Sequence, residues 1–387
     1  MDVFTALSAA LFIQRIICVS PFCISRDGAT YSKWYIFNGI LQIVVAFVIY
    51  IMNFNELIER NLFTQSNLQF SRQSQLTSVV GVFEIGITCI VFIVVLVVMY
   101  VKKEKQVEFL ELIHKTDLIF EETFKIYPNN NQKDRNIRNG SLLFFTIYHF
   151  ILSIALQFIT YSFELTFQSI LIISLYNYQV SAARFSNLTF VFYTDLVRKR
   201  FKLLERYVHG VNLSTEQDYL LIVDIFTTLQ KSHEILNDIF GLINLFTSTH
   251  DFTFIVSQLF IVIWIANQME KTMVFLKFIV VIFWFAPNVA KLVVVSNISE
   301  ATARSIKKCK NLLYKDKKVD KTTMDIVENF SLRMKHFDDN YTAINFFPID
   351  NTLLYTMIGA LTTYLFVFIQ FRMFEENYTG TSNSIIS

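Results

Sequence analysis

The last long apolar segment of the chain, residues 348–372, carries small and hydroxyl side chains at intervals of three or four residues. In a helix of 3.6 residues per turn, this spacing places them on one face. Such a stripe at membrane depth has two interpretations. It allows close packing against a neighbouring helix, or it forms one wall of a water-filled pore built from several subunits. The stripe consists of Thr352, Thr356, Gly359, Thr363, Val367 and Gln370.

Gln370 is a polar residue near the predicted outer end of this segment. In the pore interpretation it is the candidate constriction or gate, and Phe371 lies next to it. Aromatic residues form a ridge on another side of the same helix, and we expect this ridge to pack against protein. The ridge consists of Tyr364, Phe368 and Phe371.

Residues that commonly perform covalent or metal chemistry are scattered along the chain. The six histidines form no HExxH pattern, and the four cysteines form no CxxC pair. His250 and Asp251 are adjacent within an apolar segment, but no third partner is visible, so we interpret them as a packing feature. Arg184 and Lys291 also lie in apolar segments, near the predicted inner surface, and we expect them either to reach toward that surface or to anchor the helices. The sequence therefore predicts no enzyme, no metal site and no cofactor.

The elements that position these residues are long apolar helices. The chain has 387 residues, 53% of them hydrophobic, and only 13 are glycine or proline. Its mean hydropathy is +0.43. Few turns are possible, so we predict an all-α membrane protein with seven spans of about 20 residues each. The net charge of +2 does not favour a nucleic-acid partner. The spans are 34–52, 79–101, 142–161, 163–196, a fifth ending at residue 266, 273–295 and 353–371.

Lysine and arginine define the predicted orientation, because they collect in cytoplasmic loops. With the N-terminus inside, 27 of the 34 basic residues are cytoplasmic and four are outside. A G-protein-coupled receptor has the opposite orientation, which would place these 27 on the wrong side. The predicted regions are a cytoplasmic N-terminus (1–33), spans one to six (34–300) with a cytoplasmic helical extension (197–240), a cytoplasmic segment with an anchor helix (301–347), the last helix (348–372) and an extracellular tail (373–387).

Two of the cytoplasmic segments carry helical patterns. Residues 196–207 continue span four as a basic amphipathic helix, and Ser214 offers an N-cap for a helix that runs into span five. Before the last span, apolar side chains recur at helical spacing. We predict a cytoplasmic bundle formed by the lower ends of helices four to seven. Amphipathic helices lying on the inner leaflet are the alternative. The apolar positions before the last span are Val327, Phe330, Met334 and Phe337.

The last helix also contains a motif. Residues 363–371 read TYLFVFIQF, a threonine–tyrosine pair, five apolar residues and glutamine–phenylalanine. This matches the TYhhhhhQF motif in the last helix of insect gustatory receptors, and the sequence Phe346-Phe347-Pro348 before the helix is similar as well. With seven spans and an inside N-terminus, the chain resembles that family over its whole length.

The resemblance implies a homotetrameric, ligand-gated, non-selective cation channel in the plasma membrane of sensory neurons, passing Na, K and Ca ions and surrounded by membrane lipid. The last helix would line the central pore, and the lower ends of helices four to seven would anchor the subunits. Glu375 and Glu376 would then lie at the pore mouth and raise the local cation concentration. An ordinary solvated tail explains these two residues equally well.

The resemblance places the ligand pocket in the outer half of the spans. Aromatic walls with a few hydrogen-bonding groups suit a small organic ligand, although each aromatic residue could instead face lipid. Glu84 is the strongest candidate, because a carboxylate at that depth is costly and is usually paired or functional. The pocket candidates are Phe83, Glu84, Gln157, Tyr161, Phe167, Gln168, Gln258, Trp264, Phe275 and Phe278.

The ligand class is open between two branches of the family. Sugar-receptor relatives often carry glutamate directly after the TY pair, where this chain has Leu365. Because the pocket candidates are also aromatic, a tastant that is bitter or otherwise plant-derived is favoured, and a sugar receptor is the alternative. A membrane transporter is disfavoured, since no internal repeat is evident.

Overall fold

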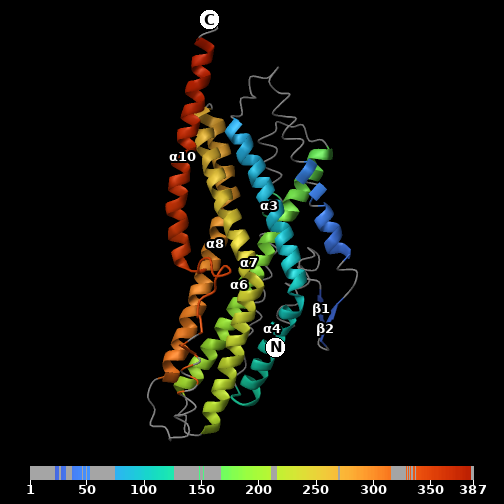
Figure 1. Cartoon of the computed structure of the whole chain (residues 1–387), viewed down its shortest axis with the longest axis vertical. Coiled ribbons are helices and arrows are strands. Elements are labelled where there is room, and N and C mark those ends of the chain that lie inside the picture. The colour runs from blue at the N-terminus through green and yellow to red at the C-terminus, as the bar shows by residue number, and fades with distance from the viewer. Residues whose placement is uncertain are drawn as a thin grey trace.

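The computed structural model describes the chain mainly as long helices that run side by side in an elongated molecule (Figure 1). Described are residues 22–25, 28–31, 37–52 apart from 46 and 49, 75–125, 167–210, 216–268, 271–314 and 337–384, with a few single residues between them. Side chains are described over shorter stretches of the same ranges. The helices are Phe37–Met52, α3 (Gln75–Val101), α4 (Lys103–Glu122), α6 (Phe167–Gly210), α7 (Glu216–Gln268), α8 (Lys271–Tyr314) and α10 (Asn351–Ser384).

Helix α7 is longer than any bilayer requires. Its 53 residues correspond to roughly 80 Å, whereas a bilayer core is about 30 Å thick. Glu216 and Asp218 in the first turn favour its start, because carboxylates stabilise a helix N-terminus. Helices α6 and α8, with 44 residues each, also exceed one span. These lengths agree with the predicted continuation of spans four to six beyond the membrane.

The lower ends of these helices form a packed core, which we call the anchor bundle. It comprises α4, residues 190–210 of α6, 216–241 of α7, 299–314 of α8 and the helical residues between 328 and 335. Aromatic rings fill its centre: Phe226 lies 5.4 Å from Phe201 and 5.4 Å from Phe330 between ring centroids. Phe330 and Met334 are buried, in agreement with the apolar spacing of that segment.

Helix α4 is the part of this bundle that the sequence did not predict, since residues 102–138 were expected to be a loop. A 62° bend at Lys102 separates α4 from α3. Arg200 of α6 donates two hydrogen bonds to Asp117 of α4, at 2.9 and 2.7 Å, and both side chains are buried. Lys102 and Lys105 bind Asp238 of α7 at 2.8 and 2.7 Å. Salt bridges therefore hold α4 against both α6 and α7.

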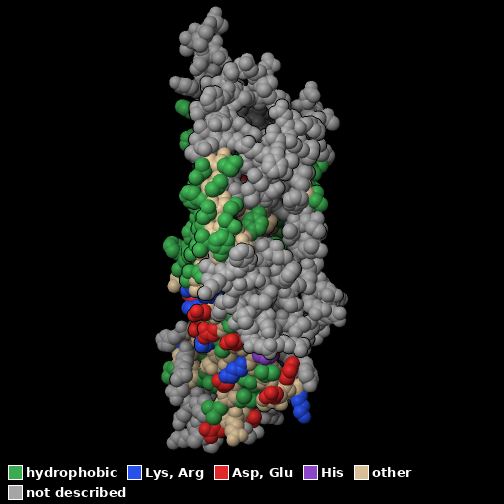
Figure 2. All heavy atoms as spheres, turned by 90° about the vertical axis from the view of Figure 1, so that its right-hand side faces the viewer, with side chains coloured by type: hydrophobic (Ala, Val, Ile, Leu, Met, Phe, Trp, Pro, Cys, Tyr) green, Lys and Arg blue, Asp and Glu red, His purple; other side chains and the backbone are tan. Residues whose placement is uncertain are grey.

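The other half of the molecule exposes apolar side chains. In Figure 2, among the residues described, hydrophobic side chains gather in the middle of the view, whereas Lys, Arg, Asp and Glu gather toward the lower end. Within those residues, parts of two helices are long and apolar enough to cross a membrane by themselves, 216–260 of α7 and 351–371 of α10. The bent pair formed by α3 and α4 meets the same criterion only when taken together.

One small element departs from the all-α prediction. Strands β1 (Phe22–Ser25) and β2 (Gly28–Tyr31) pair antiparallel, with Phe22 opposite Tyr31. Four residues are too few for strand periodicity to stand out in a sequence. The hairpin lies in the segment that we predicted as the N-terminal region.

Candidate pore helix and ligand-binding half

A compact loop of residues 337–350 connects the anchor bundle to α10. The Ile349 amide donates to the Tyr341 carbonyl at 2.8 Å, and the Ala343 amide donates to the Phe347 carbonyl at 2.9 Å. The loop rests on α7 at Gly241, where a Cβ atom would lie 3.3 Å from backbone atoms of two loop residues. The start of α10 is therefore fixed to α7 by backbone contacts that a larger side chain would obstruct.

Asp350 caps the start of α10. Its Oδ1 atom accepts a hydrogen bond from the Thr352 amide at 2.9 Å, as expected for an N-cap carboxylate. The helix then continues to Ser384, past residue 372, where we expected the tail to begin. Figure 1 shows α10 at the edge of the molecule beside α7 and α8, with its far end projecting beyond them.

The stripe of α10 faces away from the rest of the protomer. All six of its positions are exposed, and Val367 has 37% of its surface accessible. Phe371, beside the gate candidate Gln370, is 60% exposed. The hydroxyls of Thr356 and Thr363 donate to the carbonyls of Thr352 and Gly359 in the preceding turn. These hydroxyls therefore satisfy their donors within the helix and keep a lone pair for water.

Two of the three residues of the aromatic ridge contact α7. The ring of Tyr364 lies 5.7 Å from that of Phe252, and the ring of Phe368 lies 5.4 Å from that of Phe260. Both distances are typical of favourable aromatic pairs. Tyr364 and Phe368 therefore contact α7 within the protomer, although Tyr364 stays 50% exposed, and the third ridge residue, Phe371, is 60% exposed.

In the half that holds the ligand-pocket candidates, Glu84 of α3 is hydrogen-bonded to α7. Ser257 donates to its Oε2 atom at 2.8 Å, and Gln258 donates to the same atom at 3.3 Å. Gln258 is buried, so two of the ten pocket candidates meet at this point. Phe83, next to Glu84, is 58% exposed on the surface of the protomer.

One to two turns along α7 toward the anchor bundle, charged residues meet inside the helix bundle. Asp251 pairs with Lys291 of α8 at 2.6 Å, and both side chains are largely buried. His250 Nε2 lies 3.0 Å from the Thr88 hydroxyl of α3. Arg184 donates to Asn288 of α8 at 2.9 Å.

These contacts correct one expectation and favour one of two alternatives. Lys291 is the partner of Asp251 that the sequence did not reveal, because it lies 40 residues further along the chain. Arg184 and Lys291 are both bonded to neighbouring helices, as the anchoring alternative predicts.

The other pocket and mouth candidates have no described side chains. Gln157 and Tyr161 lie outside the described residues. For the rest, the structure places only the backbone: two lie at the start of α6, one near the end of α7, two near the start of α8 and two in α10. These residues are Phe167, Gln168, Trp264, Phe275, Phe278, Glu375 and Glu376.

The fold is that of insect olfactory receptors. The structure of olfactory receptor OR5 from Machilis hrabei superposes with a TM-score of 0.66 and covers 95% of this chain and 98% of that one, at 12% sequence identity. The same receptor in complex with eugenol gives a TM-score of 0.63 at 10% identity. At such low identity the likeness establishes the arrangement of the helices and no more.

The sequence itself establishes the family. The model of the 7tm chemosensory receptor family matches residues 7–375, so this chain belongs to that family. Two Drosophila melanogaster proteins provisionally named gustatory receptors 2a and 28b are 46% identical over 57 residues and 34% identical over 104 residues. These stretches cover 15% and 25% of this chain but only 13% and 22% of those proteins. The resemblance to insect gustatory receptors is thus confirmed.

Proposed function

We propose that this protein is a gustatory receptor that acts as a tastant-gated, non-selective cation channel, assembled as a homotetramer in the plasma membrane of sensory neurons. The observation that carries the proposal is that the small, polar stripe of α10 is exposed at all six positions, while Tyr364 and Phe368 contact α7. A single helix cannot enclose a pore, so the polar stripe supports a pore only when several subunits contribute it.

In this arrangement, Gln370 and Phe371 form the constriction, and Thr356, Thr363 and Val367 line the path to it. The threonine hydroxyls, each bonded to the preceding turn, offer oxygen lone pairs to hydrated cations. Tyr364 and Phe368 hold the helix on α7 so that a movement of α7 is passed to the pore. Glu375 and Glu376 would attract cations to the outer mouth.

The ligand is a small organic tastant, bitter or plant-derived rather than a sugar. Glu84, held by Ser257 and Gln258, is the polar point of the pocket, because it links α3 to α7. The solved olfactory receptor that shares this fold was determined in complex with eugenol, a small aromatic molecule, which is consistent with this ligand class. A sugar-gated receptor of the same family is the alternative.

The deciding experiment is whole-cell recording of the protein expressed alone, with Gln370→Ala as the pore variant. We expect tastant-evoked cation current without added G-protein, and we expect Gln370→Ala to change single-channel conductance and to raise the current measured without tastant. The matched control is Ile358→Ala, which removes an exposed side chain about 120° away around the helix. Unchanged conductance, rectification and gating in Gln370→Ala would show that Gln370 does not line the pore.

A further inference from the structure

Four polar side chains join α3, α7 and α8 inside the apolar half of the protomer, and we call them the polar clamp. They are Thr88 of α3, His250 and Asp251 of α7, and Lys291 of α8. The Lys291 ammonium lies 2.6 Å from the Asp251 carboxylate. His250 lies with Nδ1 3.4 Å from Asp251 and with Nε2 3.0 Å from the Thr88 hydroxyl. Thr88, His250 and Asp251 each expose 5% of their surface or less. The clamp therefore links three helices through buried contacts.

Stability alone does not account for the clamp. A buried ion pair loses the hydration of both charges, and apolar residues of similar volume are often as stabilising or more so. Ionisable side chains at membrane depth are costly and usually functional. A second cation, Arg184, interacts electrostatically with both Asp251 and Lys291, and two of its guanidinium nitrogens make no hydrogen bond to a described residue. The clamp thus concentrates charge where an apolar core would serve folding better.

Thr88 connects the clamp to the polar point of the proposed ligand pocket. Its hydroxyl lies 2.8 Å from the Glu84 carbonyl, one turn away on α3, and 3.0 Å from His250. A hydroxyl has a single proton, so it donates either to His250 or to the Glu84 carbonyl, and in the second case it accepts from His250. In both cases Thr88 joins the turn that carries Glu84 to the imidazole of α7.

The same segment of α7 contacts α10. Phe252 directly follows Asp251, and its ring lies 5.7 Å from that of Tyr364. Eight residues further along α7, Phe260 follows the two side chains that hold Glu84, and its ring lies 5.4 Å from that of Phe368. Each polar contact of α7 is therefore within one helical turn of an aromatic contact with α10. A rotation of α7 would change both kinds of contact together.

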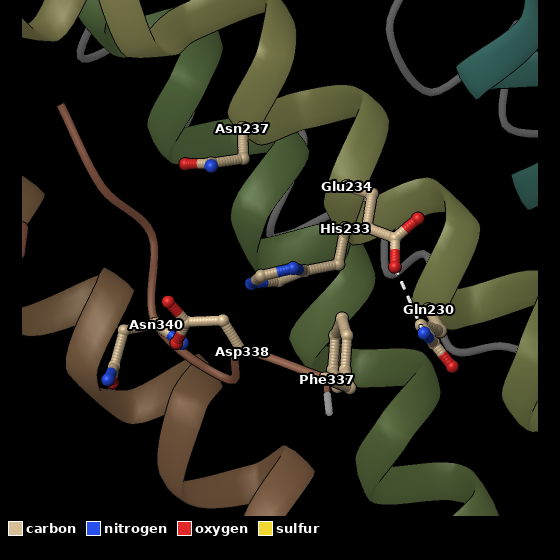
Figure 3. A pocket seen from close by; sticks show the side chains of 7 residues that line it. All are labelled: Gln230, His233, Glu234, Asn237, Phe337, Asp338 and Asn340. Atoms are coloured by element: carbon tan, nitrogen blue, oxygen red, sulfur yellow. Dashed lines mark hydrogen bonds between the residues drawn. The ribbon is translucent and has the colours of Figure 1, made fainter. Parts of the chain in front are cut away.

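Nearer the anchor bundle, the contact between α7 and the loop before α10 is less compact. A cavity of about 300 Å³ lies between residues of α7 from Gln230 to Asn237 and loop residues from Phe337 to Asn340 (Figure 3). Beside it, the Tyr341 ring lies 4.1 Å from that of His233 between centroids. Burial lowers the pKa of His233 to about 3, so this ring is neutral. Since protein interiors are generally close-packed, the cavity leaves the loop room to shift against α7.

We propose that the polar clamp positions α7 and thereby couples Glu84 to the pore helix α10. The Asp251–Lys291 pair fixes the rotation of α7 at which Tyr364 and Phe368 contact it. A movement of Glu84 changes the contact of Thr88 with His250, and the rotation of α7 changes with it. The inference rests on the proposed channel function. It assigns a role in gating to residues that belong neither to the pore stripe nor to the pocket candidates.

The first test is the tastant concentration that gives half-maximal current in Asp251→Asn and in Lys291→Met. We expect both variants to shift this concentration in the same direction, by about five- to tenfold at matched surface expression. Because the two charges act as a pair, the double variant should shift it no further than the larger single shift. A purely structural pair would instead lower surface expression and leave the half-maximal concentration unchanged.

The matched control is Lys231→Met. Lys231 also belongs to α7 and binds Glu108 of α4 at 2.6 Å, but 57% of its side chain is exposed. This variant should shift the half-maximal concentration less than about twofold. The proposal is wrong if the clamp variants shift it no more than Lys231→Met does, if their shifts have opposite signs, or if the two shifts multiply in the double variant.

Thr88→Val tests the clamp without touching a charge, and so remains informative if the charge variants fold poorly. Valine keeps the shape of threonine but loses the hydrogen bond to His250, and we expect a shift of about two- to threefold in the same direction. Thr249→Val is the control, because Thr249 is exposed beside His250 and bonds the Leu245 carbonyl of the preceding turn. Equal responses of the two variants would break the link between Glu84 and the clamp.

Amide hydrogen exchange of the purified receptor tests the coupling without current. Lys291→Met should speed exchange in residues 351–368 of α10 relative to Lys231→Met, because α7 would hold this helix less firmly. Equal exchange in the two variants would overturn the proposed coupling. If the unmodified receptor instead gave no tastant-evoked current, the channel function would be contradicted, and the exchange rates would still decide whether the clamp positions α10.

Discussion

Helices α7 and α10 are similarly apolar, yet they are used in opposite ways. In the most apolar stretch of α7, 67% of residues are buried inside the protomer, whereas in α10 the figure is 6%. Helix α7 packs against α3, α4, α6 and α8, whereas the main contacts of α10 among the described elements are with α7 and α8. The protomer therefore completes the environment of α7 but leaves most of α10 to lipid or to other subunits.

This contrast predicts that stability and conduction depend on different parts of the molecule. Substitutions around the anchor bundle should change the folding of the protomer, because their partners lie in the same chain. Substitutions on the exposed side of α10 should change conduction and leave protomer folding nearly unchanged. The predictions below test this division, beginning with the largest expected effect.

Removing Arg200 should be the most damaging change. Its two buried hydrogen bonds to Asp117 join α6 to α4. Arg200→Met would leave the buried Asp117 carboxylate unpaired. We expect a loss of about 3–5 kcal/mol of stability, measured as a lowered melting temperature of the detergent-purified receptor. Removing both charges, in Asp117→Leu with Arg200→Met, should recover much of the loss.

The control for Arg200 is Arg198→Met. Arg198 pairs with Asp195 on the same helix, and both side chains are about one quarter exposed. Partly exposed pairs contribute less than about 1 kcal/mol. Equal destabilisation by Arg198→Met and Arg200→Met would show that the buried pair does not hold α4 in place.

Acid should loosen the anchor bundle through His233. Its folded pKa of about 3 lies below the ordinary value of 6.5, so the unfolded chain takes up the proton first. The stability contributed by the neutral ring is complete above pH 6.5 and falls by about 1.4 kcal/mol per pH unit as the pH drops toward 3.

We therefore expect a loss of about 2 kcal/mol between pH 6.5 and pH 5, read from melting temperatures, and a flatter pH profile in His233→Phe. His209→Phe is the control, because His209 is exposed at the end of α6 and should leave the profile unchanged. A profile in His233→Phe as steep as that of the unmodified protein would assign the acid sensitivity to other groups.

Substitutions at two glycines compare the contact between α7 and the loop before α10 with the exposed surface of α10. Gly241→Ala should cost about 1 kcal/mol, because the new methyl group would lie 3.3 Å from the backbone of the loop before α10. Gly359→Ala in α10 meets no atom within 4 Å and should be neutral or slightly stabilising, since alanine is the better helix former. Melting temperatures of the two variants measure this difference, and equal values would mean that the loop adjusts freely on α7.

The sequence predicted those parts of the fold that long apolar runs encode. Helices α3, α6, α7, α8 and α10 lie within or extend beyond predicted spans. Helix α4 was missed because it is polar overall. Its buried residues nevertheless recur every three or four positions, and this period was the signal available. They are Gln106, Phe109, Leu110, Ile113, Thr116, Asp117 and Phe120.

The site was predictable only where its residues are close in sequence. The motif of α10 lies within nine consecutive residues, so its two sides follow from helical geometry. The partners of Glu84 are 173 and 174 residues away, and the cavity at His233 joins α7 to a loop about 100 residues later. Such pairings depend on how helices cross, which local periodicity does not contain.

The smallest effect on folding, and the most specific one on function, is expected from Thr363→Val. Valine has nearly the shape of threonine, and Thr363 is exposed in the protomer, so stability should change by less than about 0.5 kcal/mol. The stripe would lose one hydroxyl from every subunit, and the proposed pore should conduct less.

Thr362→Val is the matched control, because Thr362 is also exposed and also bonded to the preceding turn, but lies outside the stripe. If single-channel recording showed the same conductance for both variants, the exposed side of α10 would be a packing or lipid-facing surface. If Thr363→Val alone conducted less, α10 would be exposed in the protomer because it lines a pore.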